Sequence, residues 1–122
     1  MGRGSVTGLG GVFVRARDPE ALKLWYDETL GVPREDGMIV FRPDDGKLIL
    51  LGVFEHDSDY FPESQQAMLN LRVDDLDAAL ARVGGAGAEV DERRDDSALG
   101  RFGWFADPEG NRVELWEPAE GL

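Results

Sequence analysis

The chain contains one succession of predicted elements twice, and this internal repeat limits the folds that are open to it. Each copy has a strand, then a helix capped by an aspartate, then strands joined by a turn containing glycine. Gly11 aligns with Met68, and Gly46 aligns with Gly110, while few residues match beyond turns and apolar positions. We therefore predict an α+β fold of two βαβββ modules that form a cupped mixed sheet, with helices on the outer face.

The repeat also predicts the domain organisation. Residues 1–8 are rich in glycine and are expected to form a flexible N-terminal tail. Residues 9–118 are expected to form a single domain. Within that domain, the first module covers about 9–55 and the second 67–118, and a linker without clear periodicity, 56–66, joins them.

Both helices are predicted from their boundary residues. Asp18 can cap the first helix, Pro19 suits its first position, and Gly31 ends it. The second helix begins at Asp74 or Asp75, and a cluster of glycines ends it. Strands are predicted over 9–17, 38–41, 47–54, 67–73 and 101–106, with a short strand over 89–91 and a charged loop over 92–97.

The segment 107–118 reads as a tight turn followed by a strand with alternating faces. Val113 and Leu115 can lie under a helix, so Glu114 and Trp116 point to the opposite face. A carboxylate in that position needs a partner. Three alternatives remain open for Glu114: an ion pair with an arginine (Arg15, Arg72 or Arg101), an anchor for a ligand amine or hydroxyl, and a metal ligand.

Composition excludes several classes of function. The 122 residues include no cysteine, so disulfides and thiolate metal sites are excluded. The formal net charge of −12 disfavours nucleic acid as a partner. No apolar run approaches the roughly 20 residues that span a bilayer, and we expect a cytoplasmic protein with no membrane partner.

Several segments together resemble the vicinal oxygen chelate superfamily, which includes glyoxalase I, bleomycin resistance proteins and extradiol dioxygenases. The resemblance is carried by residues 11–19, 24–26 and 30–31 in the first half and by 71–76 and 107–117 in the second. It covers residues 9–118. It implies the cupped fold and a homodimer, whereas the reaction does not follow from it, because this fold hosts many chemistries.

The resemblance also implies up to four metal-ligand positions, usually filled by His, Gln or Glu. Counted from the helix starts and turns, they fall on Gly11, Leu50, Met68 and Glu114. Only Glu114 offers a suitable donor, and one carboxylate does not make a divalent-ion site. We therefore expect no metal cofactor, with a divalent metal held by Glu114 and other residues as the alternative.

The remaining candidate residues predict a ligand-binding cleft. Polar side chains in mid-strand on a concave face suit a pocket better than a core, and aromatic rings can supply its walls. Tyr60 and Phe61 could close the cleft as a lid, and His56, the only histidine, could act as a general base or lie on the surface. The predicted ligand-binding residues are Phe13, Arg15, Tyr60, Asn70, Arg72, Trp104, Glu114 and Trp116.

The favoured hypothesis is a protein of the glyoxalase or bleomycin-resistance type that binds a small organic molecule, aromatic or cationic, without a catalytic metal. The alternative is a metal-dependent lyase, isomerase or dioxygenase of the same superfamily, with His56 and Glu114 among its ligands. A third hypothesis is a structural or regulatory partner domain. The sequence does not decide whether the protein is an enzyme.

Overall fold

The computed structural model describes residues 2–122 and confirms the α+β class, with two helices and an eight-stranded mixed sheet. The chain divides into two compact units. Among the described residues, unit 1 comprises 2–10 and 69–122, and unit 2 comprises 11–68. None of the helices in the described part of the chain is long and apolar enough to cross a membrane.

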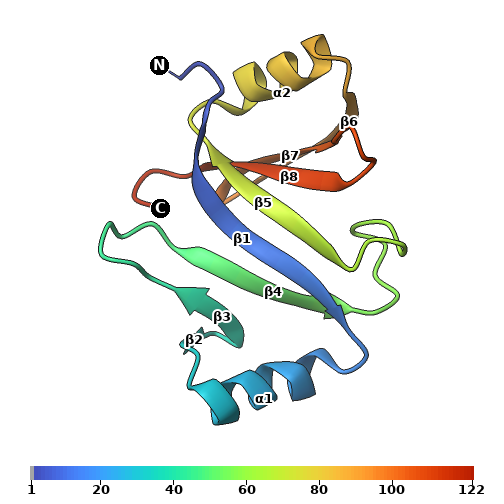
Figure 1. The fold of residues 1–122 in the computed structure, drawn as a ribbon. Helices are drawn as coiled ribbons and strands as arrows, with labels where there is room; N and C mark the ends of the chain where they lie inside the picture. The colour runs from blue at the N-terminus through green and yellow to red at the C-terminus, as the bar shows by residue number, and fades with distance from the viewer. Residues whose placement is uncertain (1) are drawn as a thin grey trace. The chain divides into compact units, whose positions relative to one another are not determined.

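Each predicted module has the expected βαβββ order (Figure 1). The first consists of β1 (Val6–Ala16), α1 (Pro19–Leu30), β2 (Arg34–Glu35), β3 (Met38–Phe41) and β4 (Ile49–Glu55). The second consists of β5 (Ala67–Val73), α2 (Leu76–Gly85), β6 (Glu89–Ser97), β7 (Gly100–Ala106) and β8 (Arg112–Pro118). In each module the first and last strands pair in parallel, and the remaining strand pairs are antiparallel.

The helix boundaries agree with the capping residues. The Asp18 carboxylate accepts a hydrogen bond from the Ala21 backbone N–H, and Gly31 adopts φ 66° at the end of α1. Asp75, rather than Asp74, caps α2. Asp74 instead accepts hydrogen bonds from the backbone N–H groups of Gly4 and Ser5, at 2.8 and 2.9 Å.

Several strand boundaries differ from the prediction. Strand β1 begins at Val6, inside the segment expected to be a loose tail. The two-residue β2 was missed because it is too short to show periodicity. The expected charged loop over 92–97 is part of β6, which pairs only with β7 and is therefore an edge strand. An edge strand tolerates charged side chains on both faces, and a register irregularity between Val90 and Arg94 interrupts its alternation.

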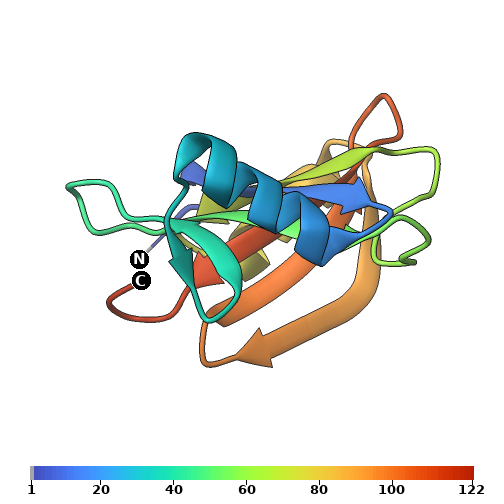
Figure 2. The ribbon, with the colours of Figure 1, turned by 90° about the horizontal axis from the view of Figure 1, so that it is seen from below.

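The two helices differ in how much they bury. In α2, Leu76, Ala79 and Leu80 are buried and pack with Val73 and Leu115 into the core of unit 1. No residue of α1 is buried. Both ribbon views show the loop between β3 and β4, residues 42–48, projecting beyond the strands that it joins (Figure 1, Figure 2).

Candidate functional site

A cluster of buried polar side chains lies on neighbouring strands of unit 1. Asn70 on β5 is in register with Glu114 on β8, which is in register with Trp104 on β7. The Asn70 amide nitrogen donates to one Glu114 carboxylate oxygen, and the Trp104 indole N–H donates to the other at 3.1 Å. Only 2% of Asn70 and 1% of Glu114 is exposed, so both polar groups have left bulk water.

Arg72 and Trp116 form a second pair two residues further along the same strands. They are in register on β5 and β8, and the Arg72 guanidinium carbon lies 4.5 Å from the centre of the Trp116 ring. Both residues are buried. The Trp116 indole N–H donates to the Leu99 carbonyl at 2.8 Å, which fixes the ring under the cation.

Trp104 connects this face to the edge of the sheet. The guanidinium groups of Arg93 and Arg112 lie 4.8 and 5.3 Å from the centre of its ring. Arg112 also donates to Asp91 at 2.8 Å. The Arg93 backbone N–H, followed by the Arg112 guanidinium, lowers the pKa of the Asp91 carboxyl.

Gly10 on β1 is required by the close approach of this cluster. A Cβ at Gly10 would lie 1.9 Å from the Asn70 side-chain oxygen and 2.9 Å from the Trp116 ring. The predicted cleft did not include this residue, although a pair of glycines within a predicted strand indicates close approach of another group. The backbone of Gly10 therefore covers the Asn70 oxygen.

In unit 2, the corresponding strands carry aromatic side chains instead. Phe13 on β1 is in register with Gly52 on β4, and its ring lies 5.3 Å from that of Phe54. The Phe54 and Tyr60 rings stack at 5.1 Å, and Phe61 meets Phe54 edge-on at 5.9 Å. Phe13 and Phe54 also line a cavity of about 260 Å³ together with Lys23, Met38, Leu50, Leu51, Gly52 and Val53.

Arg15 takes a role that the prediction of a ligand contact did not include. Its guanidinium donates to backbone carbonyls of the linker 56–66. Arg101, a second candidate partner of Glu114, forms ion pairs with Asp77 and Glu117. Of the ion-pair partners considered for Glu114, these two arginines therefore have other contacts. The Glu114 carboxylate accepts hydrogen bonds from Asn70 and Trp104.

The residues at the family's metal positions do not fit a divalent ion. Gly11 and Leu50 are register partners on β1 and β4, and neither has a donor side chain. The β5 residue opposite Glu114 is Asn70, not Met68. Asn70 directs its amide nitrogen to Glu114, and the Gly10 backbone covers its oxygen. A single carboxylate that already accepts two hydrogen bonds is too small a donor set.

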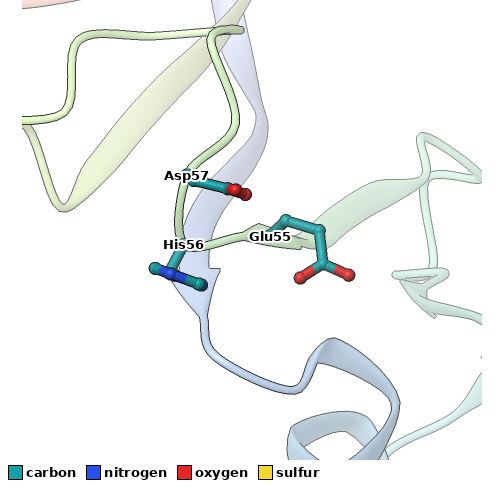
Figure 3. A group of neighbouring side chains, drawn as sticks. All are labelled: Glu55, His56 and Asp57. Carbon is teal, nitrogen blue, oxygen red and sulfur yellow. The ribbon is translucent and has the colours of Figure 1, made fainter.

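A second group of potential ligands lies at the end of β4 and in the two residues that follow it (Figure 3). The ligand atoms of Glu55, His56 and Asp57 are within 4.8 Å of one another, and all three residues are exposed. Exposed acidic groups commonly lie together without an ion, so this arrangement does not by itself indicate a metal site. His56 belongs to unit 2 and is exposed, whereas Glu114 belongs to unit 1 and is buried.

Comparisons with known proteins agree with this architecture. Residues 11–116 match the model of the glyoxalase-like domain. The chain belongs to this family. The resemblance noted in the sequence to the vicinal oxygen chelate superfamily is thereby confirmed. No curated protein matches the chain in sequence.

Solved structures similar to this glyoxalase-like domain include methylmalonyl-CoA epimerases. A variant of the Streptomyces coelicolor enzyme, in complex with 2-nitronate-propionyl-CoA, is 19% identical with a TM-score of 0.72, covering 94% of this chain and 99% of that one. The Mycobacterium tuberculosis enzyme is 24% identical with a TM-score of 0.65, covering 98% and 93%. A methylmalonyl-CoA epimerase in complex with methylmalonyl-CoA and NH4+ is 19% identical with a TM-score of 0.73, covering 95% and 97%. At these identities the likeness shows the fold alone.

Proposed function

We propose that this glyoxalase-like domain binds a small organic molecule at the face of β5, β7 and β8 that carries the polar cluster, without a divalent metal at the family's positions. The single observation that supports the proposal is the burial of Asn70, Arg72 and Glu114 in mid-strand among tryptophan rings. Burying polar and charged groups is costly for stability, and such groups are concentrated at functional sites.

The chemistry of the cluster suggests which ligand it would hold. Arg72 offers N–H donors that suit a carboxylate, carbonyl or phosphate oxygen. Glu114 offers acceptors for an amine or hydroxyl. Trp104 and Trp116 are buried beside these groups, and their rings would supply apolar surface to a ring or chain that enters the cluster. The ligand is therefore a small amphipathic molecule with at least one polar group and an apolar part.

Titration calorimetry with a panel of amines, carboxylates and short acyl-CoA thioesters tests this proposal. We expect at least one ligand whose affinity falls roughly tenfold or more in Glu114→Gln or Arg72→Met. Arg101→Met, which removes a half-exposed arginine in unit 1, is the matched control and should leave affinity unchanged. Equal affinities in all three variants would contradict a site on this face.

The absence of a resident metal is tested separately. We expect elemental analysis of protein purified without chelators to find far less than one divalent ion per chain. Titration with Mg²⁺, Mn²⁺, Ni²⁺ and Zn²⁺ should show no tight stoichiometric binding. Tight binding that survives Glu55→Gln and Asp57→Asn but disappears in Glu114→Gln would overturn this part of the proposal.

A second candidate function is proton transfer next to the carbonyl of a thioester. It is favoured by the similar structures that contain 2-nitronate-propionyl-CoA or methylmalonyl-CoA. In this chain Glu114 would act as the general base, oriented by Asn70 and Trp104. Deuterium exchange at the α-carbon of methylmalonyl-CoA, followed by NMR, tests it. Exchange that is absent, or equal in the protein and in Glu114→Gln, would reject it.

We also propose that the protein is a cytoplasmic homodimer. Apolar side chains on α1 support a contact with a second copy, because Leu24, Trp25 and Leu30 are all substantially exposed, Trp25 by 53%. Sedimentation velocity should show a dimer that Trp25→Lys converts to monomer. A monomer at all concentrations would contradict the assembly without affecting the ligand proposal.

A further inference from the structure

Arg15 organises the linker 56–66 through an unusually complete set of hydrogen bonds. Its guanidinium has five N–H groups, and each has a backbone carbonyl of the linker as its acceptor. The carbonyls of His56, Ser58, Pro62 and Gln65 accept at 2.9–3.0 Å. The fifth acceptor is the Phe61 carbonyl. No N–H of Arg15 is therefore left for a ligand.

The surroundings of Arg15 show that this arrangement is buried and internally satisfied. Only 7% of Arg15 is exposed, and its guanidinium carbon lies 4.4 Å from the centre of the Phe61 ring. The Gln66 side-chain amide donates to the Arg15 carbonyl at 3.1 Å. Within residues 2–122, the contacts of the guanidinium are with carbonyls and one ring, so the linker replaces the water that would hydrate the cation.

The linker in turn positions the aromatic side chains beside the cavity of unit 2. Tyr60 and Phe61 belong to the linker, and both contact Phe54. Tyr60 also lies 6.3 Å from Phe13, measured between ring centres. Phe13 and Phe54 are walls of the 260 Å³ cavity. A continuous series of contacts therefore runs from Arg15 through the linker to the cavity wall.

We infer that Arg15 is a positioning residue that holds the linker as a fixed support for a preformed apolar subsite, and that this subsite takes a single aromatic ring or an aliphatic group of similar size. The lining is mainly apolar, and its one charged member, Lys23, already contacts Glu20 at 2.6 Å and the Gly37 carbonyl at 3.0 Å. Apolar cavities of about 150 Å³ are known to bind benzene, so the volume here is sufficient. The inference does not depend on the polar face of unit 1.

Fluorobenzene is a suitable probe, because its ¹⁹F resonance reports binding directly. The wild-type protein should broaden and shift this resonance in a saturable manner. Met38 lines the cavity and is 48% exposed, so Met38→Trp can fill the space without disturbing the core, and Met38→Leu is its matched control. We expect Met38→Trp to abolish the saturable signal and Met38→Leu to retain it.

Arg15→Ala tests the positioning role. The N–H groups of Tyr60 and Gln65 are hydrogen-bonded within the linker, and that of Ser58 to the Glu55 carbonyl at the end of β4. Amide exchange at these three residues should become roughly tenfold faster or more. Exchange at Val40, which is buried in the same unit, should change little. Fluorobenzene affinity should fall by a similar factor, because the ring cluster loses its support.

Chemical rescue separates this role from general destabilisation. Guanidinium chloride, at millimolar concentrations well below those that unfold proteins, should restore linker protection and fluorobenzene binding in Arg15→Ala. Ammonium chloride at the same concentration should not, since ammonium lacks the planar set of donors. Rescue by ammonium alone, or no rescue by either cation, would overturn the proposed role of the five carbonyls.

Arg15→Lys keeps the experiment decisive if Arg15→Ala does not fold. Lysine retains the charge but has three donors, so the linker amides should still exchange faster than in the wild type while Val40 stays protected. Unchanged linker exchange in Arg15→Lys would contradict the positioning role. Faster linker exchange with unchanged fluorobenzene binding would contradict the link between the linker and the cavity.

Discussion

The two parallel strand pairs share one geometry and differ in chemistry. In β1 and β4, Phe13 faces Gly52 and Arg15 faces Phe54, whereas in β5 and β8 Asn70 faces Glu114 and Arg72 faces Trp116. Both arginines lie over an aromatic ring, at 4.4 Å for Arg15 and 4.5 Å for Arg72.

The difference lies in the neighbouring pair of residues. The first module has a phenylalanine opposite a glycine, which leaves space that the Phe13 ring fills. The second has an amide opposite a carboxylate, which must be hydrogen-bonded to be buried. The two modules therefore share the same pairing of strands, but the first carries an apolar pair of residues and the second a polar pair. Substitutions in each module test how far its stability depends on its own contacts.

The largest expected effect contrasts the helices of the two modules. Leu80 on α2 is 3% exposed within the core of unit 1, whereas Leu24 on α1 is 49% exposed. We expect Leu80→Ala to lower the free energy of unfolding by about 2–5 kcal/mol, because it leaves a cavity. Leu24→Ala, measured in the Trp25→Lys monomer in which no second copy covers α1, should change it by less than about 0.5 kcal/mol. Urea denaturation measures both, and equal losses would show that Leu24 is buried within a single chain.

The next effect concerns the polar cluster. In Glu114→Gln, one of the two donors, the Asn70 amide or the Trp104 indole, must face the new NH₂ group. We expect a loss of about 1–3 kcal/mol, the usual cost of a buried donor left without an acceptor. Glu109→Gln, at an exposed position in the turn before β8, should be nearly neutral by the same denaturation measurement. A neutral Glu114→Gln would mean that the two hydrogen bonds contribute little.

The helices, the main strands and the orientation of Glu114 could be predicted because they follow from local chemistry. Capping by Asp18 and termination at Gly31 involve neighbours in sequence, and alternation alone separates Glu114 from Val113 and Leu115. The partners of Glu114 could not be predicted, since Asn70 is 44 residues away and the pairing depends on register.

The role of Arg15 was missed for a different reason. Its acceptors are backbone carbonyls, which every residue possesses, so no side-chain pattern indicates them. The sequence shows only that a linker without periodicity follows β4. A prediction of a ligand contact was the natural interpretation of an arginine in mid-strand, and the structure shows that the linker itself occupies all of its donors.

Steric demand at Gly10 gives a further comparison. Gly10→Ala places a methyl group against the Asn70 oxygen and the Trp116 ring, so the polar cluster must shift, and we expect a loss of about 1–3 kcal/mol. Gly84→Ala is the control, because Gly84 lies inside α2 and its Cβ would make ordinary contact, at 3.5 Å, with Val90 of β6. That substitution should be neutral or stabilising by up to about 1 kcal/mol. Loss of stability in both would indicate that the effect is not specific to the cluster.

The smallest effect is a local response to acid in the turn before β8. Hydrogen bonds from the Asn111 backbone N–H and side chain, and from the Glu109 N–H, lower the pKa of Asp107. A lowered pKa means that this contribution is complete above the unfolded-state value, about 3.9, and is lost as the pH falls through the folded-state value. In the corresponding turn of the first module, Asp45 accepts one hydrogen bond, from the Lys47 N–H. We therefore expect acid, or Asp107→Ala at neutral pH, to accelerate amide exchange at Glu109 and Asn111. Asp45→Ala should accelerate exchange at Lys47 by a smaller factor. The opposite order would contradict this assignment of the hydrogen bonds.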